Sequence, residues 1–344
     1  MKRSTGSGFF VVALLALLGL STAAFAAGVE ELVAAAKKEG IIEFYGPSTL
    51  TPQGAQALAN AFNKKYRLEI RLGYTPSGSM FRDIGRLATE AASGAPSQWD
   101  IMVVTDAHQS LLWLKKLHMP FDYSKLGVDP KLIHYDNGSV SFSNQFVLPA
   151  YNQKALPAKD VPKRWDDLLD PKWKGGKLGI NNATHHWARL AVGAWGEKKT
   201  TEFVKALVKQ EPFLGQLGEI YSRLQLGEIL LAATLTTSQI NTARRTGAPI
   251  VFAEGIEPVV SPSYQAGVVK GAPHPNVGYL FSAFMATLGA QEIWAKYGGE
   301  TSALIAGTDA HKYVQGKQML YMTQDQAKEV DRLTNLYRTM LGFR

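Results

Sequence analysis

Short apolar runs in the first third of the chain alternate with stretches of helical periodicity. Residues 41–45, 68–74 and 101–104 are apolar or β-branched over the length of a strand. Each run is followed by apolar residues at three- and four-residue spacing, which is typical of one face of a helix. Strands that alternate with helices indicate a parallel sheet covered on both faces. This part of the chain is therefore predicted to be an α/β unit.

The middle of the chain repeats this order, which predicts a second α/β unit. No proline- or glycine-rich linker separates the units, so we expect the chain to cross between them through strands, at residues 144–151 and 253–260. Residues 277–297 predict one buried helix, and residues 324–341 predict a helix with a charged outer face. The further expected strands are residues 178–180, 229–235, 249–252 and 266–269.

The expected fold is α/β, with two lobes whose parallel-type sheets are joined by crossing strands. We assign residues 27–145 plus 256–310 to an N-terminal lobe. Residues 146–255 plus 311–344 are assigned to a C-terminal lobe. A mature chain of about 300 residues is long enough for two such domains.

The start of the chain is typical of a signal peptide. Lys2 and Arg3 precede an apolar core at residues 9–20, and a small-x-small pattern follows at residues 24–26. Twelve helical residues rise only about 18 Å, which is too short for a hydrocarbon core of about 30 Å. We therefore expect residues 1–26 to be removed and the mature protein to be periplasmic.

Composition narrows the classes of partner. The chain has no cysteine, which excludes disulfides, thiolate metal sites and cysteine nucleophiles. Its formal charge of +8 falls to +6 when Lys2 and Arg3 leave with the signal peptide, and a basic surface favours an anionic ligand. Because the basic residues form no stripe alternating with aromatics, we expect no nucleic-acid partner. We expect no cofactor and a monomer.

Each expected strand of the first unit ends in small polar residues where a helix begins. The carboxyl ends of parallel strands share one edge of a sheet, and ligands of open α/β sheets bind at that edge. Exposed N–H groups of helix starts favour an anionic ligand. Alternatively, these residues are only helix caps, or Asp106 holds an ammonium group of a zwitterionic ligand. The candidate ligand-binding residues are Ser48, Thr49, Ser77, Gly78, Ser79 and Asp106.

The second unit supplies a matching set of polar residues after its own strands. With the hydroxyls of the first unit, they are expected to surround a carboxylate, phosphonate or sulfonate. His185 and His186 suggest a metal site, but neighbouring side chains on a helix diverge by about 100°, so both rarely bind one ion. We therefore predict no metal site. The candidates are Tyr151, Thr184, His185, Thr236, Thr237, Ser238 and Gln239.

Several short motifs run in a fixed order through the middle of the chain. They are Tyr151-Asn152, Val161-Pro162, Trp165, residues 167–175, Leu178-Gly179-Ile180 and Leu226-Gly227-Glu228. This set resembles the periplasmic binding components of ferric-iron-type import systems, in the family-1 extracellular solute-binding group. The resemblance implies a type II periplasmic binding fold with a ligand in the cleft between the lobes. It also implies delivery of that ligand to the membrane permease of an ABC importer.

One departure from that family concerns the metal. Its iron-binding members carry two adjacent tyrosines just after the strand that here ends at Leu235, and phenolates are suited to ferric iron. The matching residues 236–240 contain no tyrosine. We therefore expect a small, organic anionic ligand, with a non-tyrosine site for ferric iron or another metal as the alternative.

Two other classes of function are weighed against transport. A hydrolytic enzyme of the serine type needs a Gly-x-Ser-x-Gly elbow, and the sequence has none. It also lacks HExxH, P-loop and GxGxxG motifs, so we predict that the protein is not an enzyme. A sensor subunit with the same fold stays open as an alternative to a transport subunit.

Overall fold

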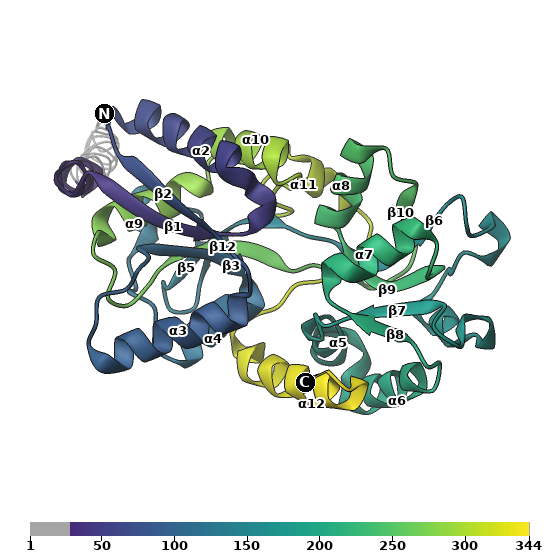
Figure 1. Cartoon of the computed structure of the whole chain (residues 1–344). Coiled ribbons are helices and arrows are strands. Elements are labelled where there is room, and N and C mark those ends of the chain that lie inside the picture. The colour runs from purple at the N-terminus through teal and green to yellow at the C-terminus, as the bar shows by residue number, and fades with distance from the viewer. Residues whose placement is uncertain (1–27, 344) are drawn as a thin grey trace, which may run out of the picture.

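A computed structural model describes residues 28–343, which form two lobes, each built on a β-sheet covered by helices (Figure 1). The two-lobed α/β fold is thus confirmed, although both sheets are mixed and not purely parallel. The first sheet has the strand order β2-β1-β3-β12-β5-β4. Its strands are β1 (Ile41–Gly46), β2 (Arg71–Pro76), β3 (Ile101–Thr105), β4 (Ile133–His134), β5 (Ser139–Asn144) and β12 (Ser263–Val268).

The first lobe follows the predicted alternation of strand and helix. β1 pairs in parallel with β2 and β3, and a helix begins at the carboxyl end of each of these strands. Phe44, Phe62 and Phe281 pack in the core beneath them. The helices of this lobe are α2 (Thr51–Tyr66), α3 (Met80–Ser93), α4 (Asp106–Leu114), α9 (Pro275–Met285) and α10 (Leu288–Tyr297), with an opening helix over residues 28–39.

The second sheet has the order β13-β11-β6-β9-β7-β8, with β10 paired to β6. β7 is parallel to β8 and β9, whereas β6 is antiparallel to β9. The strands are β6 (Val147–Asn152), β7 (Leu178–Asn181), β8 (Phe213–Gly215), β9 (Leu231–Thr236), β10 (Ile250–Phe252), β11 (Val259–Val260) and β13 (Met319–Leu320). The helices are α5 (His185–Leu190), α6 (Gly196–Val208), α7 (Leu217–Leu226), α8 (Thr237–Thr246), α11 (Asp309–Tyr313) and α12 (Ala327–Leu341).

The chain crosses between the sheets through consecutive strands. β5 lies in the first sheet and β6 in the second, so Gln145 and Phe146 form the first crossing. The return crossing is at Ser261 and Pro262, between β11 and β12. The predicted segment, residues 253–260, ends one residue before this crossing, because Val260 still pairs with Val147 of β6. The lobe boundaries at residues 146, 256 and 311 stay a prediction.

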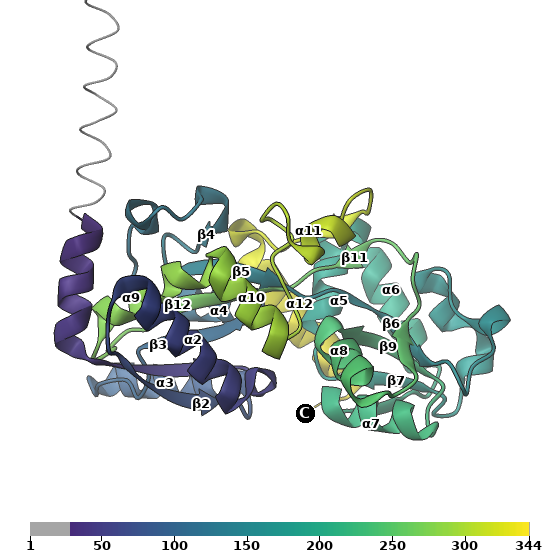
Figure 2. The same cartoon turned by 90° about the horizontal axis from the view of Figure 1, so that it is seen from above.

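One predicted helix is two helices. Residues 277–297 were expected to be continuous, but α9 ends at Met285 and α10 begins at Leu288. Thr287 is the N-cap of α10, and its side chain accepts a hydrogen bond from the Ala290 amide. The bend brings the end of α10 to the gap between the lobes, where α11 and α8 also lie (Figures 1 and 2).

α12 lies across both lobes (Figure 1). It packs against α4 of the first lobe and against α5 and α6 of the second. Val330, Leu333 and Tyr337 place it in the hydrophobic core of the second lobe. The predicted signal peptide, residues 1–26, lies outside the described residues. Among the described residues, no helix has the length and apolar character needed to cross a bilayer.

Candidate functional site

The ends of β1 and β2 lie side by side, as the parallel pairing requires. The Ser77 amide donates to the Gly46 carbonyl at 2.8 Å, which joins the two turns. Ser79 occupies the N-cap position of α3, yet its side chain makes no cap hydrogen bond. Ser48, Gly78 and Ser79 are exposed, and Thr49 and Ser77 are half-buried. The hydroxyl of Ser79 is therefore available to a ligand.

Asp106 forms a buried ion pair between the lobes. Both Nη atoms of Arg189 donate to its carboxylate, Nη1 to Oδ2 at 3.0 Å and Nη2 to Oδ1. The two residues are 2% and 1% exposed. Asp106 begins α4 of the first lobe, directly after β3. Arg189 lies on α5 of the second lobe, which follows β7, so this interlobe pair connects the helices that follow these two strands. Thr105, not Asp106, occupies the N-cap position of α4.

Three histidines surround the Arg189 guanidinium. The ring of His108 lies 6.2 Å from that of His185, which lies 4.4 Å from that of His186. Burial, and then the charge of Arg189, lowers the pKa of His108 to about 4 and that of His186 to about 3. Burial first, and then the neighbouring His186, lowers the pKa of His185 well below its ordinary value. All three rings are therefore neutral at physiological pH.

Arg189 was missed by the sequence analysis. It stands four residues after His185, so both side chains lie on one face of α5. Arg189 Nε and His185 Nδ1 are buried without a hydrogen-bond partner among the described residues. Thr184, in contrast, donates its hydroxyl to the Thr334 carbonyl of α12 at 3.0 Å and is fully buried. The structure therefore brings Asp106 and His185 together through Arg189, and Thr184 anchors α12.

At the start of α8, two of the candidates cap the helix. Thr236 and Gln239 form a capping box, in which the Gln239 side chain accepts from the Thr236 amide at 3.2 Å. The Thr237 hydroxyl accepts from the Phe146 amide at 2.7 Å, so it also holds the first crossing. Ser238 is buried. The hydroxyls of Thr236 and Thr237 thus already have partners within the chain.

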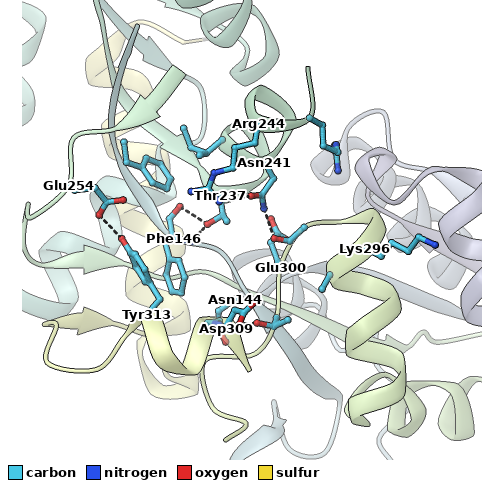
Figure 3. Close-up of a pocket in the computed structure, with 17 residues that line it drawn as sticks. Asn144, Phe146, Thr237, Asn241, Arg244, Glu254, Lys296, Glu300, Asp309 and Tyr313 are labelled. Carbon is cyan, nitrogen blue, oxygen red and sulfur yellow. Dashed lines mark hydrogen bonds between the residues drawn. The ribbon is translucent and has the colours of Figure 1, made fainter. Parts of the chain in front are cut away.

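A cavity of about 490 Å³ opens between the lobes where α8 faces α10 and α11 (Figure 3). Thr237, Ile240, Asn241, Arg244 and Arg245 line one wall, and their spacing is that of a single helical face. Of the predicted site residues, only Thr237 lines this cleft cavity within the described chain. The other lining residues are Asn144, Phe146, Phe252, Glu254, Ala295, Lys296, Gly299, Glu300, Thr301, Asp309, Ala310 and Tyr313.

The charges of the cleft cavity come from both lobes. Arg244, Arg245 and Lys296 are basic, and Glu254 accepts a hydrogen bond from the Tyr313 hydroxyl at 3.1 Å. Figure 3 shows the Arg244 side chain extending from α8 along the wall of the cavity that this helix forms. Asp309, the second acidic group, lies 3.5 Å from the ammonium group of Lys312. The cavity thus holds three basic side chains and, besides Glu300, two acidic ones.

Glu300 is the buried acid of this cavity. It is 4% exposed and accepts from the Gln145 side chain at 3.1 Å. Burial raises the pKa of its carboxyl to about 8, while the hydrogen bond from Gln145 acts to lower it. Because Gln145 belongs to the first crossing, the protonated carboxyl of Glu300 contacts the segment that connects the two lobes.

Tyr151 lies apart from the other candidates. It pairs with Leu231 at the first residue of β9, whereas Val147 pairs with Thr236 at the last. Five residues of a strand span about 16 Å. Tyr151 is not among the residues that line the cleft cavity, although Phe252 of the paired strand β10 is. Its place in the ligand site stays a prediction.

A family model described as bacterial extracellular solute-binding protein matches residues 42–300. The chain belongs to this family. The resemblance predicted from the motifs is thus confirmed, and the chain is a solute-binding protein of the transport type. No curated protein matches it.

Several solved structures share the fold of this solute-binding protein. Iron-bound HitA of Pseudomonas aeruginosa matches with a TM-score of 0.71 and 17% identity, over 87% of this chain and 99% of that one. A substrate-binding protein of an ABC transporter from Agrobacterium tumefaciens gives a TM-score of 0.71 and 15% identity, over 88% and 94%. MotA of A. tumefaciens B6, in complex with glucopine, gives 0.68 and 17%, over 87% and 99%. At these identities the likeness concerns the fold alone.

No cluster of three or more histidine, aspartate or glutamate side chains within residues 28–343 is placed to hold an ion. His108, His185 and His186 lie around the Arg189 guanidinium, and its positive charge opposes a cation at that position.

Proposed function

We propose that this chain is the periplasmic binding component of an ABC importer and that it captures a small organic anion between its lobes. The proposal rests first on the family, whose members bind solutes outside the cytoplasmic membrane. It rests second on one observation, the cleft cavity of about 490 Å³ with walls from both lobes and Arg244, Arg245 and Lys296 among its lining residues. A volume of this size accommodates a small molecule.

The class of ligand follows from the polar groups. Arginine and lysine side chains donate hydrogen bonds and accept none, so Arg244, Arg245 and Lys296 match carboxylate, sulfonate or phosphonate oxygens. Hydrogen bonds to charged groups contribute about 1.5–3 kcal/mol each. Three or four of them are enough for micromolar affinity, which needs about 8 kcal/mol, after ordering costs.

Ferric iron is the second candidate ligand, because HitA is iron-bound and shares the fold. Against it stand Thr236, Thr237 and Ser238, which offer neutral hydroxyls after β9, and two of these hydroxyls already have partners. The complex of MotA with glucopine favours an organic ligand on the same fold. We therefore place the organic anion first.

Native mass spectrometry of freshly purified mature protein tests this proposal. We expect a co-purified organic anion that is released on unfolding, and a colourless protein after addition of ferric citrate. Titration calorimetry with the released molecule then gives its affinity. A protein that binds ferric iron stoichiometrically and retains no organic molecule would replace this proposal with the metal alternative.

A further inference from the structure

A second cavity lies on the side of the molecule where α12 meets the first lobe. Its volume is about 510 Å³, and it shares no lining residue with the cleft cavity. Trp113 and Leu114 come from the end of α4, Tyr135 and Asp136 from the turn between β4 and β5, and Lys328 from the start of α12. The remaining lining residues are Lys116, His118 and Pro120.

Aromatic rings form one wall of this second cavity. The Trp113 and Tyr135 rings have centroids 6.0 Å apart, and His118 lies 6.3 Å from Tyr135. The indole N–H of Trp113 already donates to Asp136 at 2.8 Å, and the His118 Nε2 lies 2.7 Å from the Gln109 amide oxygen. Because the indole N–H has a partner, the half-buried Trp113 ring offers a ligand mainly its apolar face. Tyr135 is 2% exposed and packs behind it, and His118 Nδ1 is buried without a partner among the described residues.

Two lysines supply positive charge at the rim. Lys116 and Lys328 are exposed, and neither makes an ion pair with any residue in the described part of the chain. Asp136 is the acidic residue of the lining. Its carboxylate accepts from the Trp113 indole and from the Gln324 amide at 2.7 Å, so its oxygens are directed to neutral donors. Aromatic faces next to unpaired ammonium groups match a planar aromatic anion.

The turn that forms the floor of the cavity is held rigidly. Tyr135, Asp136 and Asn137 have φ angles of 56°, 54° and 64°, a left-handed run that is costly for residues other than glycine. The Tyr135 hydroxyl donates to the Asp106 carbonyl at 2.9 Å, and the Asp136 amide donates to Gln324 at 3.0 Å. These bonds hold the turn in place, so the cavity is preformed before any ligand binds.

We propose that this second cavity is a binding site for a planar aromatic monoanion, separate from the solute cleft. The Trp113 ring contacts its apolar body, and Lys116 with Lys328 pair with its charged group. Since Lys328 begins α12, which packs in the second lobe, while the rings belong to the first, a bound anion contacts both lobes.

Calorimetric titration of the mature protein with naphthalene-2-sulfonate tests the site. We expect binding with a Kd at or below about 1 mM, and at least tenfold weaker binding of both 2-naphthylmethanol, which lacks the charge, and methanesulfonate, which lacks the ring. Lys116→Gln with Lys328→Gln should weaken the sulfonate tenfold or more. The matched pair Lys37→Gln with Lys64→Gln, two other exposed lysines, should leave its Kd within twofold.

Two results would overturn the proposal. One is the absence of sulfonate binding at about 10 mM. The other is an unchanged Kd in the Lys116→Gln/Lys328→Gln variant, when the thermal midpoint of this variant equals that of the parent protein. Arg244→Gln separates this site from the cleft. If Arg244→Gln abolishes sulfonate binding, the sulfonate binds in the cleft cavity, and this result also contradicts the second site. If Arg244→Gln abolishes only the binding of the transported solute, the result concerns the proposed function and leaves the second site supported.

Discussion

Asp106 and Arg189 connect the lobes through charges that water barely reaches. Removing one partner of a buried pair leaves the other charge uncompensated, which costs about 3–5 kcal/mol. We expect Asp106→Asn to lower the free energy of unfolding by that amount. Replacing both members, as in Asp106→Leu with Arg189→Met, should cost less than Asp106→Asn alone. Urea denaturation measures both, and a loss below about 1 kcal/mol for Asp106→Asn would show that the pair is not buried in solution.

Glu300 makes stability depend on pH. The pKa of its carboxyl is about 8 in the folded protein, against an ordinary value of 4.5. Between these values the folded protein holds a proton that the unfolded chain has lost, so its stability falls as the pH rises. Glu300→Gln removes this dependence. The stability of the variant relative to the parent should therefore increase by on the order of 2–4 kcal/mol from pH 5 to pH 8.

Urea denaturation of both proteins across that pH window checks the prediction for Glu300. Glu69→Gln serves as the control, since Glu69 is an exposed glutamate of the first lobe. A difference between Glu300→Gln and the parent that stays constant with pH would mean that the carboxyl is ionised at neutral pH. In that case, the cleft cavity would carry one more negative charge than we infer.

At the scale of the element, the starts of α3 and α8 have different roles. Thr236 caps α8, so Thr236→Ala should cost about 1 kcal/mol of stability. Ser79 stands at the same position of α3 but makes no cap bond, so Ser79→Ala should change stability by less than about 0.5 kcal/mol. Thermal or urea unfolding of the two variants compares them directly. Equal losses would show that Ser79 is a cap and is not free for a ligand.

Ser79 is the N-cap residue of α3 in the first lobe and Arg244 lies on α8 in the second, and both are exposed. We expect Ser79→Ala with Arg244→Gln to weaken the affinity for the co-purified anion at least tenfold, because each loses a hydrogen bond to a charged group. The unfolding midpoint should stay unchanged. Ser93→Ala with Arg164→Gln removes the same groups from other exposed positions and provides the control. Unchanged affinity in the first pair would remove both residues from the site.

The elements that sequence predicted well are those with strong local periodicity. The strand at Ile41 begins at the predicted residue and ends one residue later than predicted. Its position was predictable because the apolar run that marks it consists of neighbouring residues. The break between α9 and α10 was missed because apolar residues continue through it and only the cap at Thr287 marks it. Arg189 was missed because its partner is 83 residues away in the sequence and on the other lobe.

At the scale of the whole molecule, the two lobes are joined by chain crossings and by the packing of one helix. Gln145 and Phe146 at one crossing, and Ser261 and Pro262 at the other, join the sheets, while α12 packs against both lobes (Figure 2). The repeated alternation of strands and helices predicted this division from the sequence. The capping-box pattern of Thr236 and Gln239 is local and distinguishes Thr236 from Ser79. The bond between Thr237 and Phe146 depends on how the chain crosses between the lobes, so the sequence does not indicate it.

The central claim is that residues far apart in the chain hold one anion between two lobes. A crystal structure of the mature protein with its co-purified ligand tests this most directly. The account predicts electron density for an organic anion in the gap, with Arg244 from α8 and Ser79 from α3 both within hydrogen-bond distance. A ligand bound to one lobe alone, or a metal ion held by protein oxygens in its place, would contradict it.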